Sequence, residues 1–284
     1  MPIDLHAASQ FIEANARLLE RHLAGVLLDG DAPALALAAL AAYQNADGGF
    51  GHALEPDIRC PGSQPAATLA GLEVLAEVRA STDPMVQQAA DWVAGVANPD
   101  GGVPTVLPSA EGHPRAPWMQ PSPDSGFLTF AIAARLWQLE VTHRWLERGT
   151  DWCWHHIEAD QAPAGYTVKF ALDFLDAVPD TDRAVAAIER LRPAIRPDGT
   201  VGVEGGVEDE KITPLGLSAR PGAPSRALFS DAQIEADLDR LELGQQADGG
   251  WDFDFLHWSP AQALEWRGRT TLGAIDTLRR HRRG

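Results

Sequence analysis

Cysteines are few in this sequence, and long apolar runs and a basic start are absent from it. Its only two cysteines, Cys60 and Cys153, lie far apart with no CxxC spacing, so we expect reduced and structurally ordinary thiols. No apolar run reaches about 18 residues, so we expect no integral membrane span. The first residues lack a basic and then apolar signal pattern, and a cytoplasmic location is therefore expected.

Positive charge is also scarce. The chain has 23 Lys and Arg residues against 40 Asp and Glu residues, a formal net charge of −17. Without an excess of cations it cannot displace counterions from phosphates, so we expect no nucleic-acid binding. In contrast, 284 residues with 45 % hydrophobic content are enough to bury a sizeable core without a disulfide or a structural metal.

A short glycine-containing motif recurs along the chain. Residues 44–50 read Gln-Asn-Ala-Asp-Gly-Gly-Phe, and residues 245–251 read Gln-Gln-Ala-Asp-Gly-Gly-Trp. Residues 98–103 and 196–201 are weaker copies, Asn-Pro-Asp-Gly-Gly-Val and Arg-Pro-Asp-Gly-Thr-Val. Internal repetition of this kind is typical of repeat architectures, in which each copy is one supersecondary unit.

The spacing of the copies predicts the number of units. Their aspartates are separated by 53, 98 and 50 residues: Asp47, Asp100, Asp198 and Asp248. The middle gap is almost twice the others and indicates one eroded copy, near residues 160–163. The sequence therefore predicts about five units of roughly 50 residues each.

Each turn is expected to join two helices of different character. Asp-Gly-Gly ends the first helix, because Asp bonds its own backbone and Gly accepts a positive φ without steric cost. The first helices are predicted over 34–43, 84–97, 181–191 and 231–243, and the more uniformly apolar second helices over 66–78, 126–137 and 271–278. A helix that is apolar nearly all round must be buried, so we expect an inner and an outer layer. Periodicity alone allows either an open solenoid or a closed barrel.

The helix starts are marked by capping sequences. Asp83 and Ser259 each precede a proline, which is favoured at the first helical position. Ser230 with Gln233, and Ser259 with Gln262, fit the capping-box pattern, in which the two side chains bond each other's backbone N–H groups. A further helix over about residues 4–24 is expected to pack on the barrel.

The Gln-x-x-Asp-Gly-Gly-Trp/Phe unit resembles the glutamine–tryptophan repeat of squalene and oxidosqualene cyclases and the related repeat of protein prenyltransferase β subunits. Those families fold as α/α toroids with a cavity inside the inner ring. The resemblance implies an all-α fold, an α/α toroid (a double-layered helical barrel) of about five helix pairs, with residues 1–284 forming a single domain. It also implies a terpenoid cyclase-like or prenyltransferase-like function on an apolar, isoprenoid-type small molecule.

The catalytic signatures of these families are incomplete here. Class II cyclases use Asp-x-Asp-Asp to protonate an alkene, and the nearest sequence is Asp252-Phe253-Asp254-Phe255. The Asp-Asp-x-x-Asp magnesium motif of class I synthases is absent. The prenyltransferase zinc pair Asp-x-Cys is matched only by Asp151 and Cys153, within an expected outer helix. We therefore expect no metal and no other cofactor, and if the protein is an enzyme, an acid-initiated cyclase or isomerase.

The segment after the last turn is the first candidate site. Asp252 and Asp254, two residues apart on an extended loop, point to the same side, where repulsion favours one of them as a general acid. Glu265 is a third candidate acid. Substrate-binding walls are expected from nearby aromatic and basic side chains: Trp251, Phe253, Phe255, Trp258, Trp266 and Arg267. The alternative is that the two aspartates are solvated and that Glu265 pairs with Arg269 on one helix face.

The segment after the first turn is the second candidate. His52, Glu55 and Asp57 are suited to proton transfer or to metal ligation, although a salt-bridged loop explains them equally well. Loops that follow outer helices emerge at one rim of a toroid, so we expect both candidate segments to share a cavity mouth. The long loop 103–123 adds Trp118 as a candidate substrate contact.

A third cluster, Trp152 to His156, is interpreted as core packing because adjacent helical histidines point about 100° apart.

Two other functions of the whole chain remain open. It is alternatively a non-catalytic binding scaffold, or a carbohydrate-active α/α barrel that uses paired carboxylates. A cavity lined by Leu, Phe and Trp favours the isoprenoid substrate, and one lined by charged groups with tryptophan platforms favours a sugar.

Overall fold

The computed structural model describes residues 3–159 and 163–283, and its regular structure is mainly helical. The α-helices are α1 (Leu5–Asn15), α2 (Leu18–Ala24), α3 (Ala34–Ala41), α4 (Pro65–Glu77), α5 (Pro84–Val96), α6 (Leu128–Gln138), α7 (Arg144–Ala159), α8 (Gly165–Leu175), α9 (Thr181–Leu191), α10 (Pro214–Leu217), α11 (Asp231–Leu243) and α12 (Pro260–Arg280). Shorter elements are a π-helix (Gly25–Asp29), three 3₁₀ turns (Pro108–Ala110, Arg192–Ala194 and Pro224–Leu228) and an antiparallel pair, β1 (Val201–Gly202) with β2 (Lys211–Ile212). None of the described helices has the length and apolar character needed to cross a membrane.

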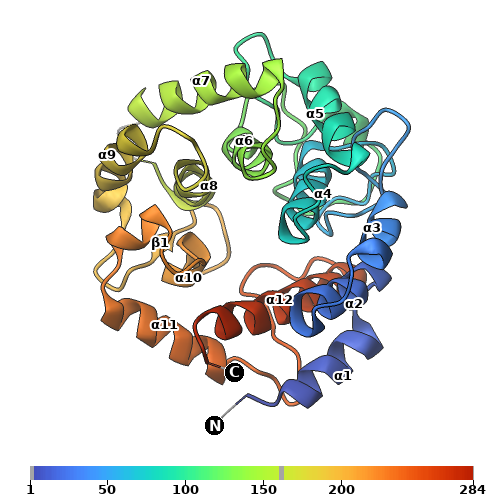
Figure 1. The fold of residues 1–284 in the computed structure, drawn as a ribbon, viewed down its shortest axis with the longest axis vertical. Coiled ribbons are helices and arrows are strands. Elements are labelled where there is room, and N and C mark those ends of the chain that lie inside the picture. Colours follow the sequence, from blue (N-terminus) through green and yellow to red (C-terminus); the bar gives the residue numbers. More distant parts are fainter. Residues whose placement is uncertain (1–2, 160–162, 284) are drawn as a thin grey trace.

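The elements follow one another around a ring, with helices alternating between an outer and an inner position (Figure 1). α1, α3, α5, α7, α9 and α11 lie outside, whereas α2, α4, α6, α8, α10 and α12 lie inside. α1 packs against α12, so the two ends of the chain are neighbours. The predicted eroded repeat copy near residues 160–163 falls mostly on residues 160–162, which lie outside the described residues.

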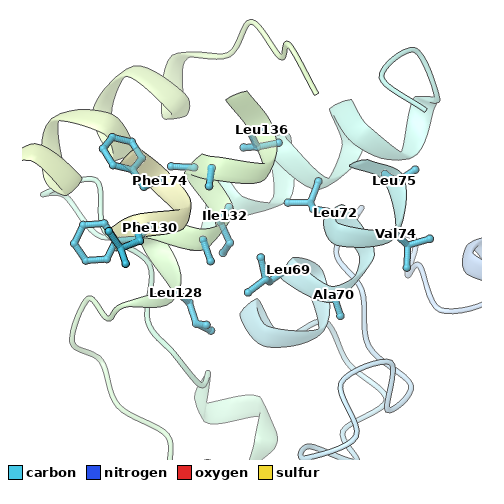
Figure 2. Packing of buried hydrophobic residues seen from close by; sticks show 14 of the residues in the cluster. Leu69, Ala70, Leu72, Val74, Leu75, Leu128, Phe130, Ile132, Leu136 and Phe174 are labelled. Atoms are coloured by element: carbon cyan, nitrogen blue, oxygen red, sulfur yellow. The ribbon is translucent and has the colours of Figure 1, made fainter. Parts of the chain in front are cut away.

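The two layers differ in burial as their sequences predict. On α9, burial follows a single stripe with helical spacing: Ala184, Ala187, Ile188 and Leu191. On α4, ten consecutive or nearly consecutive positions from Pro65 to Leu75 are buried. The core lies mainly between inner helices, where Leu72 of α4, Leu136 of α6 and Phe174 of α8 are almost fully enclosed (Figure 2).

The N-terminal helix differs from its prediction. Instead of one helix over about residues 4–24, the backbone is extended at Ala16 and Arg17, with ψ values of 159° and 160°. The break aims the Arg17 guanidinium at the carbonyl groups of Ala53 and Leu54, at 3.0 and 3.1 Å. The tertiary contact therefore overrides the local helical preference and divides the segment into α1 and α2.

The first repeat turn joins three elements through one carboxylate. Asp47 Oδ1 accepts hydrogen bonds from the Gly49 backbone N–H at 3.0 Å and from the Ser63 hydroxyl at 2.7 Å. Its Oδ2 accepts from Trp92 Nε1 of the next outer helix, α5, at 3.1 Å. Asp47 thus stabilises the turn and also connects it to the loop before α4 and to α5.

The residue after the glycine pair makes a second recurring bond. The Phe50 backbone N–H donates to Thr68 Oγ1 of α4 at 3.1 Å. Two other turns do the same with the inner helix that follows them: Val103 with Thr129 at 2.8 Å, and Trp251 with Thr271 at 2.9 Å. The three turns share this geometry, in which an apolar residue follows the glycines and packs against the next inner helix.

The last turn is anchored on the first helix. A Cβ added to Gly249, whose φ is +89°, would lie 2.3 Å from the Ala7 carbonyl oxygen of α1. Gly48 of the first turn approaches Gln88 of α5 in the same way, with a hypothetical Cβ only 2.5 Å from its carbonyl oxygen. Gln245 adds bonds to the Asp4 backbone N–H and carbonyl at 2.8 and 2.9 Å. The last turn therefore uses α1 as its next outer helix.

Gly249→Ala is expected to lower the free energy of unfolding by about 3 kcal/mol, because it combines a positive φ with a backbone clash. Urea unfolding followed by circular dichroism measures this loss. Gly273→Ala on α12 is the matched control, because nothing lies within 4 Å of its added Cβ. That control is expected to be neutral or slightly stabilising. A Gly249→Ala loss no larger than that of the control would contradict docking of the last turn on α1.

Candidate functional site

The loop after the first turn is held by Arg17, the residue immediately before α2. His52 and Ala53 have φ values of +54° and +60°, which non-glycine residues rarely adopt. The carbonyl groups of Ala53 and Leu54 accept from the Arg17 guanidinium, which is itself paired with the buried Glu20 at 2.5 Å. These contacts offset the backbone strain and fix the direction in which the following residues, Glu55 and Asp57, enter the molecule.

The long loop 103–123 closes over the other side of the same segment. The Ala116 N–H donates to the Asp57 carbonyl at 2.8 Å, and the Arg59 N–H donates to the Pro114 carbonyl at 2.9 Å. Between these bonds, Ile58 and Arg115 form an isolated antiparallel bridge. The segment is consequently sandwiched between α2 and this loop, and Asp57 is only 4 % exposed.

The Asp57 carboxyl group meets three donors from the last repeat unit. Its Oδ1 accepts from Trp266 Nε1 at 3.0 Å, from Gln262 Nε2 at 3.1 Å and from Trp258 Nε1 at 3.2 Å. Trp258 precedes α12, and the other two donors lie one turn apart on that helix. The structure therefore brings the two candidate segments into direct contact, around 200 residues apart in sequence.

This environment acts on Asp57 in two opposing ways. Burial raises the pKa of Asp57 above its usual range, while hydrogen bonds from Trp266, Gln262, Trp258 and Trp118 lower it in part. Trp266, Gln262 and Trp258 all donate to Oδ1, so they stabilise the anion that remains when a proton leaves Oδ2. A carboxyl group in this setting retains its proton at higher pH than a solvated aspartate. When it does lose the proton, the hydrogen-bond donors that stabilise the carboxylate are already in place.

Glu55 is a second buried carboxyl group beside Asp57. It is 8 % exposed, and its Oε1 accepts weakly from the Asp57 backbone N–H at 3.4 Å. Burial raises the pKa of Glu55 to about 8, even though Arg269 Nη1 lies 3.5 Å from its Oε2 and lowers it. Arg269 also pairs with Glu73 of α4 at 3.1 Å, so it links the loop to an inner helix.

Aromatic rings surround the Asp57 carboxyl group. Phe255 packs edge-on against Trp266, with ring centroids 5.3 Å apart, and against Trp118 at 6.2 Å. Phe253 contacts Phe255 at 4.4 Å, and the Arg269 guanidinium lies 4.8 Å from the Trp266 ring. The electron-rich faces of such rings attract positive charge, and their bulk excludes water. The site therefore combines a protonatable acid with walls that tolerate a cation.

The inner wall beyond this site is charged. A cavity of about 80 Å³ lies between α2, α4 and α12. Its polar lining comes from Arg17, Glu20, Glu73, Glu77, Arg269 and Asp276, and leucines provide much of the remainder. The described inner ring at this position is thus not a purely apolar chamber.

The remaining predicted acids lie outside the Asp57 cluster. Asp252 and Asp254 are exposed, and Asp252 pairs with His257 at 3.3 Å. His52 is exposed and contacts Asn45 Oδ1 at 3.0 Å. Asp252 and Asp254 therefore lie at the surface, separate from the buried Asp57 carboxyl group.

Three other predicted contacts are used structurally. Trp251 is 2 % exposed and donates from Nε1 to the Leu241 carbonyl at 2.7 Å. Arg267 makes two bonds of 2.8 Å to Asp248 of the last turn. Glu265 pairs with Arg59 at 2.6 Å and not with Arg269, the alternative partner on its own helix. These side chains hold the turn and the two segments together.

The third cluster forms part of the core, as its interpretation indicates. Trp152, Cys153 and Trp154 are buried, and burial raises the pKa of the Cys153 thiol. Trp152 Nε1 donates to Asp100 of the second turn at 3.2 Å, and His156 stacks on the Trp152 ring. Within residues 3–159 and 163–283, no group of three His, Cys, Asp or Glu side chains is placed to hold a metal ion.

Gln262 is the site residue that sequence reasoning missed. Its predicted role was the second half of a capping box with Ser259, and Ser259 Oγ does accept from the Gln262 N–H at 3.2 Å. The Gln262 side chain, however, turns away to Asp57 and leaves the box half formed. At Ser230, where no acid competes for the glutamine, the complete capping box is present. The sequence signal for this role is the position of Gln262 between Trp258 and Trp266, the other two donors to Asp57.

Comparison with known proteins identifies the fold. The sequence matches no protein-family profile and no curated protein. Among solved structures, a protein from Actinoplanes superimposes with a TM-score of 0.60 at 19 % identity, covering 97 % of this chain and 98 % of that one. A variant of the type II terpene cyclase MstE from Scytonema, in complex with its substrate geranylgeranyl dihydroxybenzoate, gives 0.54 at 14 % identity, with 97 % of each chain covered. The apo form of MstE gives 0.52 at 14 % identity over 96 % of each chain. The chain thus has a terpene cyclase-like fold.

Proposed function

We propose that residues 1–284 form one closed α/α toroid of about five repeats that catalyses an acid-initiated cyclisation or isomerisation of an apolar, isoprenoid-type substrate. Asp57 is the acid in this proposal. The observation that carries it is the Asp57 carboxyl group, buried among aromatic rings with Trp258, Gln262 and Trp266 all donating to Oδ1. The acid is therefore placed on the first repeat loop, in preference to Asp252 or Asp254.

The proposed reaction begins with proton transfer from Asp57 Oδ2 to an alkene carbon. The π electrons form the new C–H bond, the neighbouring carbon becomes cationic, and Asp57 becomes a carboxylate. The three N–H donors then stabilise this carboxylate, because they already point at Oδ1 before the proton leaves. Trp266, Phe255 and Trp118 offer π faces to the cation. The product cation then loses a different proton to water and forms a new alkene. Solvent returns a proton to the Asp57 carboxylate, so the reaction ends with no net change in atoms.

Two further observations support this substrate class. The solved structures with the same fold include a type II terpene cyclase in complex with a geranylgeranyl dihydroxybenzoate substrate. Large apolar side chains of the segments around Asp57 are exposed: Trp118 is 45 % exposed, Leu256 41 % and Leu264 45 %. Exposed apolar side chains of this kind offer a surface to which an apolar chain can bind. The proposed substrate therefore has an isoprenoid tail, and its head group is left open.

The test is incubation of the full chain with isoprenoids of increasing length, from farnesyl to squalene, and with geranylgeranyl dihydroxybenzoate. We expect a cyclised or isomerised product of unchanged mass, detected by chromatography with mass spectrometry. In D₂O the product is expected to gain one deuterium, because the exchangeable Asp57 proton initiates the reaction. Absence of conversion across the series would overturn the proposal.

The charged inner wall favours a second candidate, a carbohydrate-active enzyme. Glu55 and Glu73 both contact Arg269, at 3.5 and 3.1 Å, so paired carboxylates do lie on the wall of the ring. Glycoside hydrolysis uses two such groups flanking the scissile bond. Release of reducing sugar from an oligosaccharide panel, lost in Glu73→Gln and retained in Asp57→Asn, would select this candidate. Inactivity in both panels would favour the non-catalytic scaffold.

A further inference from the structure

The cavity between α2, α4 and α12 has a mainly apolar depth and a charged mouth. Its volume is about 80 Å³. Glu77 and Gly273 are exposed residues of its lining, so the cavity opens where these two residues lie. The buried residues of the lining are mostly apolar: Leu19, Leu23, Leu54, Ala70, Val74 and Leu272. A ligand that enters at the mouth therefore meets charge first and aliphatic side chains beyond it.

The charged groups of this lining are paired, with the exception of Glu77. Within residues 3–159 and 163–283, the Glu77 carboxylate makes no side-chain hydrogen bond or ion pair. Three ion pairs compensate the other charged lining residues: Arg17 with Glu20 at 2.5 Å, Arg269 with Glu73 at 3.1 Å, and Asp276 with Arg280 at 2.6 Å. The mouth of the cavity consequently carries one uncompensated negative charge.

The Glu77 carboxylate faces the middle of the ring. Water reaches it there, yet the surrounding protein desolvates it and raises the pKa of Glu77 to about 7. Glu73 on α4 and Asp276 on α12 raise this pKa further by repulsion. Arg269 on α12 and Arg135 on α6 lower it in part. A cation placed beside Glu77 supplies the counter-charge that a proton supplies at lower pH.

The apolar walls suit a short aliphatic chain. Leu19 and Leu23 lie one turn apart on α2, and Leu27 continues their stripe on the π-helix Gly25–Asp29. A π-helix is a rare element that is frequently found at functional sites. An apolar cavity of about 150 Å³ holds one benzene molecule, so about 80 Å³ accommodates a chain of about three or four carbon atoms.

We propose that this cavity binds a small primary alkylammonium, with its chain between the leucines and its ammonium group beside the Glu77 carboxylate. One free carboxylate matches one positive charge. A divalent metal ion is a poorer match, because it prefers several carboxylate oxygens and the Glu73 and Asp276 carboxylates are already paired. The site is separate from the reaction proposed at Asp57, since the donors to Asp57 Oδ1 do not line this cavity.

n-Butylammonium is the probe, and butan-1-ol is its neutral counterpart of equal chain length. Titration calorimetry of the full chain at pH 8 is expected to show saturable butylammonium binding, about tenfold or more tighter than that of butanol, the value of one charge-assisted hydrogen bond. Nα-acetyl-L-lysinamide carries the same butylammonium group on a peptide unit. Its affinity relative to butylammonium distinguishes a lysine side chain from a free amine as the source of the ligand.

The affinity for butylammonium is expected to depend on pH. It falls about tenfold between pH 8 and pH 6, because Glu77 takes up a proton through its pKa of about 7 while the alkylammonium stays charged. Glu77→Gln is expected to lower the affinity at pH 8 about tenfold or more, to remove this pH dependence and to leave butanol binding unchanged. Glu147→Gln, at an exposed position of α7 outside the lining, is the matched control and is expected to change nothing.

Gly273→Leu tests the location of the site. It places a side chain at the cavity mouth, where an added Cβ meets nothing within 4 Å, and is expected to abolish binding of both butylammonium and butanol. Absence of saturable butylammonium binding, or equal affinity of Glu77→Gln and the unaltered chain at pH 8, would rule out the site. Because binding is measured without turnover, failure of the reaction proposed at Asp57 leaves this result unaffected.

Discussion

Asp57→Asn is expected to reduce turnover of the isoprenoid substrate about a thousandfold or more, since general acid catalysis contributes on the order of 10²- to 10⁴-fold. Asparagine keeps the shape of the side chain, and its Oδ1 can still accept from Trp258, Gln262 and Trp266. Its amide group cannot supply a proton to an alkene. The expected result is therefore loss of kcat in a protein that unfolds at nearly the same urea concentration.

Asp254→Asn is the matched control, because Asp254 is exposed and belongs to the loop that the sequence favoured for the acid. Its turnover is expected to stay within about twofold of the unaltered protein, as is usual for an exposed substitution outside the reacting groups. The reverse pattern, with Asp254→Asn inactive and Asp57→Asn active, would move the acid back to the exposed pair. Full activity of both variants would show that neither the Asp57 nor the Asp254 carboxyl group supplies the proton.

The second large effect concerns stability and pH at Glu55. Burial raises its pKa from the ordinary 4.5 to about 8 in the folded protein. Between these values the folded state holds a proton that the unfolded chain has released, so the free energy of unfolding falls as the pH rises. Glu55→Gln removes this loss, because glutamine stays neutral. The variant is therefore expected to be more stable than the unaltered protein by about 5 kcal/mol above pH 8, and to match it below pH 4.5.

Urea unfolding of both proteins at a series of pH values between 4 and 9 measures this difference. Arg269 keeps its contact with Glu73 at 3.1 Å in the variant, so it does not lose its remaining partner. Glu13→Gln, at an exposed position of α1, is the control and is expected to leave the pH profile unchanged. A constant difference between Glu55→Gln and the unaltered protein across this range would contradict a raised pKa at Glu55.

The sequence predicted those features whose causes are local. Asp-Gly-Gly specifies its turn through an aspartate bonding a nearby N–H and a glycine at positive φ, and Asp47 and Asp248 show both. Proline at the first helical position located the starts of α5 and α12. The two-layer arrangement also followed, because α9 carries one apolar stripe and α4 is apolar on nearly all sides.

The site depended on contacts that no local pattern encodes. Asp57 and its three donors are separated by about 200 residues in sequence, so their hydrogen bonds arise only when the ends of the ring meet. Asp252 and Asp254 satisfied the local criterion of paired acids, yet the structure leaves both in solvent. Likewise, the helix predicted to be continuous is divided at Arg17, whose guanidinium donates to two carbonyl groups in a distant loop.

Docking of the last turn on α1 has a consequence for how the protein unfolds. An open solenoid has two end units with one neighbour each, and these fray first. Here Gly249 packs on Ala7 and Gln245 bonds Asp4, so the first and last units each have neighbours on both sides. The contacts between units therefore depend on their order around the ring and not on where the chain begins. A circular permutant that joins the two termini and opens the exposed segment 204–209 preserves every interface between helices, and it is expected to unfold in a single cooperative transition.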